Sequence, residues 1–243
     1  KEWKDYIYEI SEPGNFDSLY RAHASHPMQM PKGSAITKTE AADAIYVISR
    51  ISGEGADRKA EPGDYYLSEQ EEEELKAITE CYDNTIVILN VGGVMDVSFL
   101  EKYNIAALVM LSQAGMEGGN ALADVLSGAV TPSGKLTDTW GCHYEDYPSS
   151  ATFSHNNGNI IEEKYYEGIY VGYRYFDSFE VEPRYPFGYG MSYTTFDVAT
   201  ENAAWKPDAE SKTITVTVKV TNTGSCAGKE VVQLYYGAPQ GKL

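Results

Sequence analysis

The sequence predicts an α/β fold with a doubly wound, mostly parallel sheet, followed by a partial all-β region. Three short apolar runs, at 44–49, 85–90 and 106–111, are each followed by a segment with helical features. Strands that alternate with helices over short links are typical of a parallel sheet with right-handed crossovers. Farther along, residues 212–222 alternate strictly between apolar and polar side chains, which indicates a half-buried antiparallel strand.

The first elements have clear local signals. The apolar residues of the first turns recur at helical spacing up to Ile10, and Pro13 with Gly14 ends this predicted helix. The run 44–49 is rich in β-branched residues and suits a buried parallel strand. Ser68 and Glu71 form a capping-box pattern that predicts a helix over 69–81, with an acidic first turn that complements the helix dipole.

The later elements continue the same rhythm and then change character. A strand over 85–90 leads to a short helix near 96–102, and a strand over 106–111 leads through a glycine-rich turn to a helix over 117–126. After Gly128 the chain becomes loop-rich and aromatic. Residues 230–236 resemble one further strand after 212–222. A β-sandwich needs about seven strands, so this second domain is predicted to be incomplete.

Composition excludes some classes of function. The formal net charge of −17 disfavours a nucleic-acid or anionic-membrane partner. No stretch approaches the roughly 20 consecutive apolar residues of a membrane-spanning helix. The start, Lys1-Glu2-Trp3-Lys4, has neither an initiator Met nor the plan of a signal peptide. We therefore expect a fragment or a processed chain, and both a cytoplasmic and a secreted location stay open.

Cysteine and histidine patterns indicate neither a metal nor a cofactor. Cys81, Cys142 and Cys226 are far apart and odd in number, which favours free thiols over a disulfide. His23 and His26 have a spacing that a helix could use for a metal, but Pro27 follows directly and favours an extended segment. The expectation is no metal site.

Chemistry in an open parallel sheet is expected in the loops at the carboxyl ends of the strands. The loop 50–59 is the richest of these, because Gly53 and Gly55 flank Glu54 and let its carboxylate project freely. From spacing alone two interpretations stay open: a functional carboxylate, or an ion pair with a neighbouring cation of the same loop. The candidate cations are Arg50, Arg58 and Lys59.

Two other segments have alternatives of their own. The loop 112–119 lacks both phosphate-binding glycine patterns, so a plain strand-to-helix turn with close packing is favoured over a nucleotide site. The aromatic stretch 165–177 could stack on sugar rings or pack between domains, and packing is favoured.

The motifs together resemble the bacterial β-glucosidase branch of family 3 glycoside hydrolases. The segments that carry the resemblance, in family order, are 48–59, 115–119 with 123–128, 132–136, 166–175, 186–194, 222–224 and 228–231. The resemblance implies that 1–140 form the later part of an α/β sandwich domain and 141–193 a connecting segment. Residues 194–243 would then begin a fibronectin-III-like domain that is incomplete here, and a (β/α)₈ barrel is expected outside this chain.

The resemblance also implies a reaction. Members of the family cleave terminal β-linked sugars with retention of configuration, which needs two carboxyl groups on the two sides of the scissile bond. Glu54 matches the catalytic acid/base, and the nucleophile is an Asp on the barrel. Asp57 and Arg58 are expected to order the loop, with Asp57 the alternative acid/base. The expected substrate is a β-linked oligosaccharide or glycoside, no cofactor is implied, and this chain alone is expected to be inactive. A non-catalytic scaffolding role in a substrate cleft is the competing hypothesis.

Overall fold

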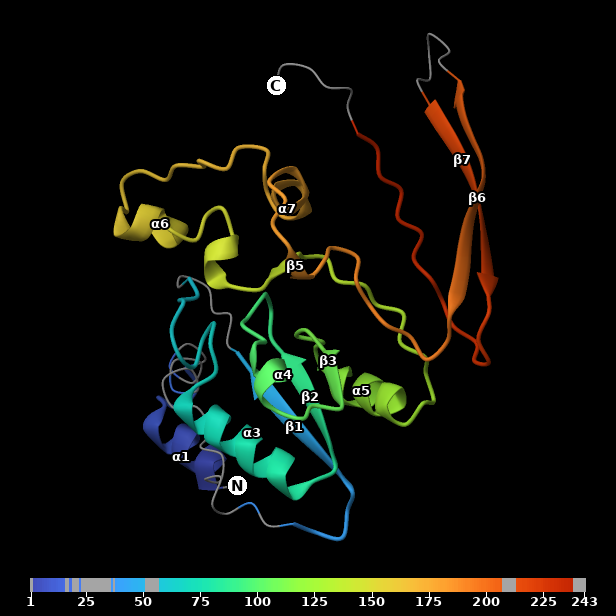
Figure 1. The fold of residues 1–243 in the computed structure, drawn as a ribbon. Coiled ribbons are helices and arrows are strands. Elements are labelled where there is room, and N and C mark those ends of the chain that lie inside the picture. The colour runs from blue at the N-terminus through green and yellow to red at the C-terminus, as the bar shows by residue number, and fades with distance from the viewer. Residues whose placement is uncertain are drawn as a thin grey trace. The chain divides into compact units, whose positions relative to one another are not determined.

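The computed structural model describes residues 2–15, 18, 22, 36, 38–50, 57–206 and 213–237. The chain divides into two compact units, Lys1–Ala114 and Gly115–Leu243 (Figure 1). The domain boundaries expected near residues 140 and 193 stay predictions.

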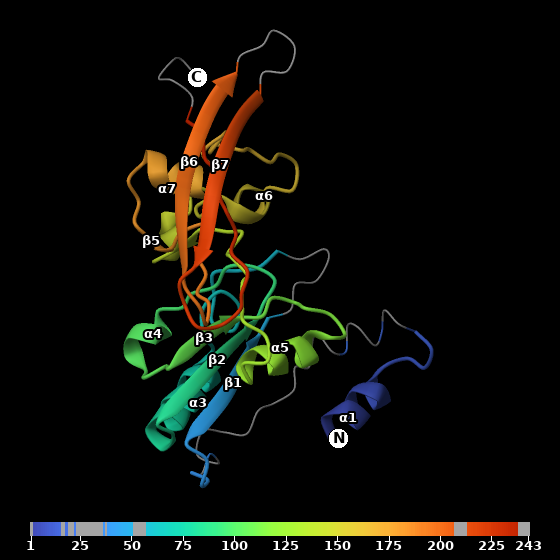
Figure 2. The same cartoon turned by 90° about the vertical axis from the view of Figure 1, so that its right-hand side faces the viewer.

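The first unit is built on a three-stranded parallel sheet. Its strands are β1 (Asp43–Ser49), β2 (Asn84–Asn90) and β3 (Ala107–Met110), in the spatial order β1-β2-β3 (Figure 2). The register pairs Asp43 with Asn84 and Ser49 with Asn90, so β1 and β2 run side by side over their full length and end together. This confirms the predicted parallel α/β sheet.

Helix α3 (Glu69–Cys81) packs against β1 and β2 and covers one face of the sheet (Figure 1). It begins at the predicted capping box: the Glu71 N–H donates to the Ser68 hydroxyl, and the Ser68 N–H donates to the Glu71 carboxylate. Its inward side includes Leu75 and Glu74, and Glu74 accepts a hydrogen bond of 2.5 Å from the Tyr46 hydroxyl of β1.

The first unit also contains the shorter helices α1 (Glu2–Ile10) and α4 (Phe99–Lys102). Helix α1 contains the fully buried Ile7, and α4 contains the fully buried Phe99. The chain turns at Gly14 after α1, as Pro13 and Gly14 predicted.

Burial differs between the central strand and its neighbour. Val87 and Leu89 of β2 are fully buried, whereas β1 buries Ile48 but leaves Ile45 and Val47 55% and 46% exposed. Within the described residues β1 is an edge strand, and its covered face is the one against α3. A strand buried on both faces was expected, so β1 departs from the usual pattern of a parallel sheet.

The second unit has several short elements, joined by irregular segments, and one pair of long strands. They are α5 (Gly118–Leu126), β4 (Trp140–Gly141), the 3₁₀ helix η2 (Tyr144–Asp146), α6 (Phe153–Gly158), α7 (Tyr173–Ser178), β5 (Pro183–Tyr185), β6 (Phe196–Lys206) and β7 (Thr213–Asn222). Strands β4 and β5 pair antiparallel, as do β6 and β7.

The β6–β7 pair carries the alternation seen in the sequence. Val216 and Val218 are half-buried, while Thr217 and Lys219 are exposed. Ile214 and Val220, expected on the same half-buried face, are exposed, so the pattern holds only in the middle of the strand. The register shifts near Thr200, where β6 has an irregularity of the β-bulge type.

The strand predicted over 230–236 is wrong, because the structure assigns no strand there. A strand needs a ladder partner, and the described residues supply none to this segment. Side chains hold it instead: Gln233 Nε2 donates to the Gly188 carbonyl at 3.1 Å, and Tyr235 packs edge-on against Tyr173.

Some sequence expectations concern thiols, metals and membranes. The three cysteines are free, as predicted. Among the described residues no group of three or more His, Cys, Asp or Glu side chains could hold a metal ion. His23 and His26 lie outside these residues. In the same part of the chain, no helix combines the length and the apolar character needed to cross a bilayer.

Candidate active-site loop at the carboxyl edge of the sheet

The loops that follow the three strands of the first unit meet at one edge, as parallel topology requires. The Arg50 N–H donates to the Asn90 carbonyl at 3.2 Å, and Asn90 Nδ2 donates to the Ser49 hydroxyl at 3.3 Å. From the loop after β3, Gln113 Nε2 donates to the Arg50 carbonyl at 3.3 Å. The first residue of the loop 50–59 is therefore joined to both other strand ends.

Glu54, the predicted acid/base, lies outside the described residues, which exclude 51–56. The structure describes the residues on each side of that segment: Arg50 before it, and Asp57, Arg58 and Lys59 after it. The contacts of these residues show where the loop is attached and which of its cations already have carboxylate partners.

Arg50 uses all five of its N–H donors. Its Nη1 and Nη2 contact the two carboxylate oxygens of Glu71 at 2.7 and 2.8 Å. The remaining donors reach three backbone carbonyls: Nε that of Asp64 at 2.7 Å, Nη1 that of Ser49 at 2.9 Å and Nη2 that of Tyr66 at 3.2 Å. Arg50 is buried, and it has no donor left for another carboxylate.

Glu71 links this arginine to the start of α3. One of its oxygens accepts both the Ser68 N–H, within the capping box, and Arg50 Nη2. The bidentate geometry is the strong form of an arginine–carboxylate pair. The base of the loop is therefore joined to the first turn of a helix that packs on the sheet.

Arg58 anchors the other side of the loop. Its Nε donates to Asp64 Oδ1 at 2.7 Å, its Nη2 to the Asp64 carbonyl at 2.9 Å, and its Nη1 to the Val94 carbonyl at 2.7 Å. The N–H of the next residue, Lys59, donates to Asp64 Oδ2 at 2.6 Å. Arg58 thus connects the loop after β1 to the loop after β2.

The remaining charged residues of the loop are less engaged. Lys59 Nζ lies 3.7 Å from Glu61 Oε1, and both side chains are largely exposed. Asp57 is exposed and makes no hydrogen bond or ion pair with the described residues. The loop-ordering roles expected for Asp57 and Arg58 stay predictions, although the Arg58 contacts favour that role for Arg58.

Sequence reasoning missed Asp64. The available signal was the Pro62-Gly63-Asp64 turn, in which Gly63 has a φ of +86°. Four backbone hydrogen bonds close this turn: the N–H groups of Asp64 and Tyr66 both donate to the Glu61 carbonyl, that of Gly63 to the Tyr66 carbonyl, and that of Tyr65 to the Lys59 carbonyl. The turn composition indicated a bend, but not that its Asp would meet two arginines.

The glycine-rich loop before α5 is a plain turn. Gly115 has a φ of +72°, and the Glu117 carboxylate accepts a hydrogen bond of 2.6 Å from Asn120. The close packing expected of this turn is wrong for Gly115 and Gly119, because a Cβ added to either would meet open space.

The aromatic stretch of the second unit divides in two. Tyr165 and Tyr166 are 79% and 66% exposed. Tyr173 packs against the rings of Phe187 and Tyr235, with centroids 5.3 and 5.7 Å apart. The later part of the stretch therefore packs within this unit, and packing between domains stays a prediction.

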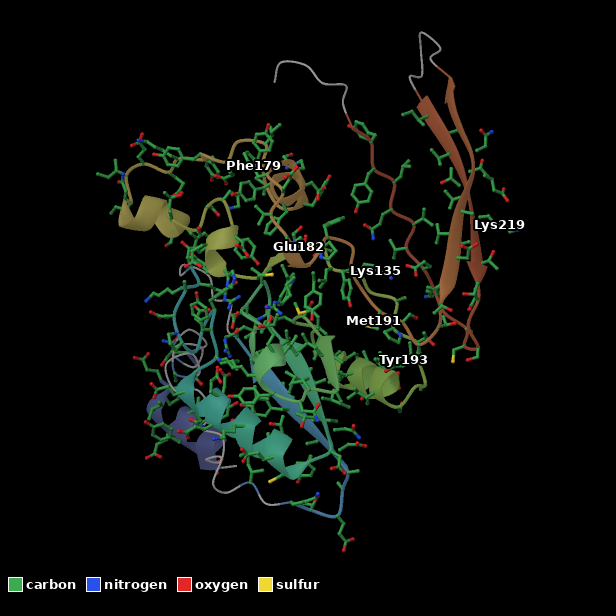
Figure 3. The ribbon with its side chains drawn as sticks, viewed as in Figure 1. Lys135, Phe179, Glu182, Met191, Tyr193 and Lys219 are labelled. Atoms are coloured by element: carbon green, nitrogen blue, oxygen red, sulfur yellow. The ribbon has the colours of Figure 1, made fainter. Side chains whose placement is uncertain are left out.

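A second cluster lies in the second unit around Lys135 (Figure 3). Lys135 Nζ donates to the Gly190 carbonyl at 2.8 Å and pairs with Glu230 Oε1 at 3.0 Å. The Val231 N–H and then Lys135 hold the pKa of Glu230 below its usual range, because both stabilise the carboxylate. This cluster joins three of the motif segments, 132–136, 186–194 and 228–231.

Comparison with known proteins decides the family. Residues 29–193 match the glycosyl hydrolase family 3 C-terminal domain. The chain belongs to glycosyl hydrolase family 3. Among family 3 relatives, the β-glucosidase A of Butyrivibrio fibrisolvens is 42% identical over 237 residues, covering 82% of this chain and 28% of the relative. The β-glucosidase of Ruminococcus albus is 38% identical over 247 residues, covering the whole chain and 25% of the relative.

Solved structures of family 3 enzymes share the fold. A β-glucosidase from Paenibacillus barengoltzii has a TM-score of 0.72 at 37% identity, covering 86% of this chain and 25% of its own. β-Glucosidase 3B from Thermotoga neapolitana, in complex with glucose, has a TM-score of 0.71 at 34% identity, covering 93% of this chain and 32% of its own. The chain spans about a quarter to a third of the length of these relatives.

Proposed function

We propose that the chain is part of a retaining β-glucosidase that hydrolyses terminal non-reducing β-D-glucosyl residues. Membership of family 3 and the β-glucosidase names of its relatives support the activity. The glucose bound to the Thermotoga neapolitana enzyme supports a glucoside as substrate. The nucleophile and the groups that hold the terminal sugar are assigned to a (β/α)₈ barrel outside these 243 residues.

Glu54 is the acid/base in this proposal. In the first step its carboxyl group gives a proton to the glycosidic oxygen, the bond from that oxygen to the anomeric carbon breaks, and the nucleophile carboxylate forms an ester to that carbon. In the second step the Glu54 carboxylate takes a proton from water, the water oxygen bonds to the anomeric carbon, and the ester breaks. Glucose leaves, and both carboxyl groups return to their starting states.

The main support for this assignment is that all the N–H donors of Arg50 already have partners other than Glu54. The competing interpretation made Glu54 a partner of a cation in its own loop. Arg50 has all five donors occupied, and Arg58 gives one donor to the Asp64 carboxylate and two to backbone carbonyls. Both arginines therefore have carboxylate partners of their own, and Lys59, 3.7 Å from Glu61 and largely exposed, is the remaining candidate cation. An exposed lysine forms only a weak ion pair, which favours a functional role for the Glu54 carboxylate.

Replacing Glu54 by Gln in the complete polypeptide tests the proposal. Methyl β-D-glucoside needs protonation of its leaving group, so its kcat/KM is expected to fall about 10²- to 10⁴-fold. 2,4-Dinitrophenyl β-D-glucoside has a leaving group that departs without a proton, so its kcat/KM is expected to fall far less. Azide, which needs no general base, is expected to restore turnover of the dinitrophenyl substrate and to yield glucosyl azide.

Asp57→Asn is the matched control, since Asp57 is the other carboxylate of the loop. It is expected to leave the ratio of the two substrates unchanged and to show no response to azide. If Asp57→Asn produced the leaving-group pattern instead, Asp57 would be the acid/base. Unchanged kinetics for both variants on both substrates would favour a scaffolding role for the loop.

A further inference from the structure

Both sides of the segment 51–56 are attached to one residue, Asp64. From the N-terminal side, Arg50 Nε donates to the Asp64 carbonyl at 2.7 Å. From the C-terminal side, Arg58 Nη2 donates to the same carbonyl at 2.9 Å and Arg58 Nε to the Asp64 carboxylate at 2.7 Å. The Lys59 N–H donates to the second carboxylate oxygen at 2.6 Å. We call these four residues the Asp64 clamp.

The clamp is fixed to the sheet through three independent attachments. Glu71 holds Arg50 and belongs to the capping box of α3. The Val94 carbonyl, in the loop after β2, holds Arg58. The Tyr65 carbonyl accepts the Asp96 N–H at 2.9 Å, so the residue next to Asp64 is joined to that same loop. Asp64 therefore has little freedom to move relative to the strand ends.

We infer that Asp64 is a positioning residue for the glycosidic reaction, one that holds the acid/base loop in place by clamping both of its flanks. The inference rests on the proposed role of Glu54. Asp64 does not touch substrate in this scheme. It acts on the reaction through the backbone that carries the acid/base.

The position of the acid/base loop matters for the rate because proton transfer has a short range. A general acid must come within about 2.6–3.2 Å of the atom it protonates. A misplacement of about 1 Å can cost about 10²-fold in rate. Loosening the flanks of the loop should therefore impair the steps that need a proton and leave sugar binding nearly unchanged.

The Asp64→Asn variant changes only the contacts that the Asp64 side chain makes. It keeps the backbone carbonyl that accepts from Arg50 and Arg58. The two carboxylate oxygens now accept from Arg58 Nε and the Lys59 N–H, and an amide offers only one acceptor to these two donors. The C-terminal side of the loop, which carries both donors, must therefore lose a hydrogen bond, while the N-terminal side keeps the bond from Arg50 to the Asp64 carbonyl.

Kinetics of Asp64→Asn in the complete polypeptide test the inference. For methyl β-D-glucoside we expect kcat to fall about 10- to 100-fold with KM changed less than about threefold. For 2,4-dinitrophenyl β-D-glucoside we expect kcat/KM to fall less than about threefold, because protonation is not needed. Asp43→Asn is the matched control: Asp43 bonds Asn84 at the opposite end of β1, and no change is expected there.

The double variant Glu54→Gln with Asp64→Asn separates positioning from a general structural effect. If Asp64 acts through Glu54, the double variant should be no slower on methyl β-D-glucoside than Glu54→Gln alone. Additive losses, or equal losses of Asp64→Asn on both substrates, would overturn the inference. If Asp64→Asn does not fold, Arg58→Lys replaces it, because it keeps the charge and removes the fork that reaches Asp64 and Val94.

The two proposals fail in different ways. If Glu54→Gln lacks the leaving-group pattern, the proposed function is wrong, whatever Asp64→Asn does. If Glu54→Gln shows the pattern and Asp64→Asn resembles Asp43→Asn, the proposed function stands and the positioning role of Asp64 is wrong.

Discussion

The two units hold their irregular segments by different physical means. In the first, directional hydrogen bonds from Arg50 and Arg58 converge on Asp64 and Glu71. In the second, backbone hydrogen bonds join the segments, from the Leu136 N–H to the Tyr189 carbonyl and from the Gly188 N–H to the Leu136 carbonyl, both at 2.8 Å. The backbones approach so closely there that a Cβ at Gly190 would collide with the Gly134 carbonyl oxygen. The first unit thus relies mainly on charged side chains, and the second on close backbone contact that a side chain at Gly190 would prevent.

The difference matters because the two methods respond to different changes. Bidentate, charge-assisted hydrogen bonds define orientation as well as distance, and removal of one partner leaves the other buried and unpaired. Close backbone packing keeps its backbone hydrogen bonds when a side-chain charge is removed, but it tolerates no added volume. The first unit should therefore be sensitive to loss of charge and the second to gain of atoms.

The largest effect is expected for Arg50→Met in the first unit. The change removes five hydrogen bonds and breaks a largely buried ion pair, although the Glu71 carboxylate keeps the Ser68 N–H and the Asp64 carbonyl keeps Arg58 Nη2. It should destabilise the unit by about 3–5 kcal/mol. Hydrogen-exchange protection of the α3 amides in the complete polypeptide measures it. Lys59→Met, at an exposed cation, should leave that protection unchanged. Equal protection in both variants would show that charge does not hold this unit.

Gly190→Ala should have the next largest effect, on the second unit. The added methyl group would collide with the Gly134 carbonyl oxygen, at an expected cost of about 1–3 kcal/mol. Gly134→Ala is the control, because a Cβ at Gly134 meets open space. Thermal unfolding of both variants checks this, and similar melting temperatures would contradict the role assigned to close approach.

The smallest effect is expected for Glu230→Gln, which removes the ion pair with Lys135. Because the folded pKa of Glu230 is lowered, its stabilising contribution, about 1 kcal/mol, is present above the ordinary Glu pKa and is lost as the pH falls below about 4. The melting temperatures of the variant and the unchanged protein should differ at pH 7 and converge in acid. A difference that does not shrink as the pH falls below the ordinary Glu pKa would contradict this electrostatic origin.

Local signals made α3 predictable to the residue. Ser68 and Glu71 are three residues apart, and a capping box needs no information from elsewhere in the chain. The parallel strands were predicted to within one residue at each end, because the runs are too short for buried helices and alternate with helical segments. Strand pairing was harder: residues 230–236 have the composition of a strand but no ladder partner among the described residues.

The site was only partly predictable for a related reason. The motif around Glu54 indicated which loop carries the chemistry, but the partners of that loop depend on the folded chain. Arg50 meets Glu71 across 21 residues and Arg58 meets Val94 across 36. No local pattern relates such pairs, so Asp64 was identified only from the structure.

The two-sided attachment to Asp64 has a consequence for loop engineering. Bringing the ends of a flexible segment together has an entropic cost that grows slowly with its length. Here the residues on both sides of the six-residue segment 51–56 are joined by contacts outside that segment, so this cost does not fall on its own sequence. We therefore expect that six-residue loops from other family 3 enzymes can replace residues 51–56 as long as Arg50, Asp64 and Arg58 are kept.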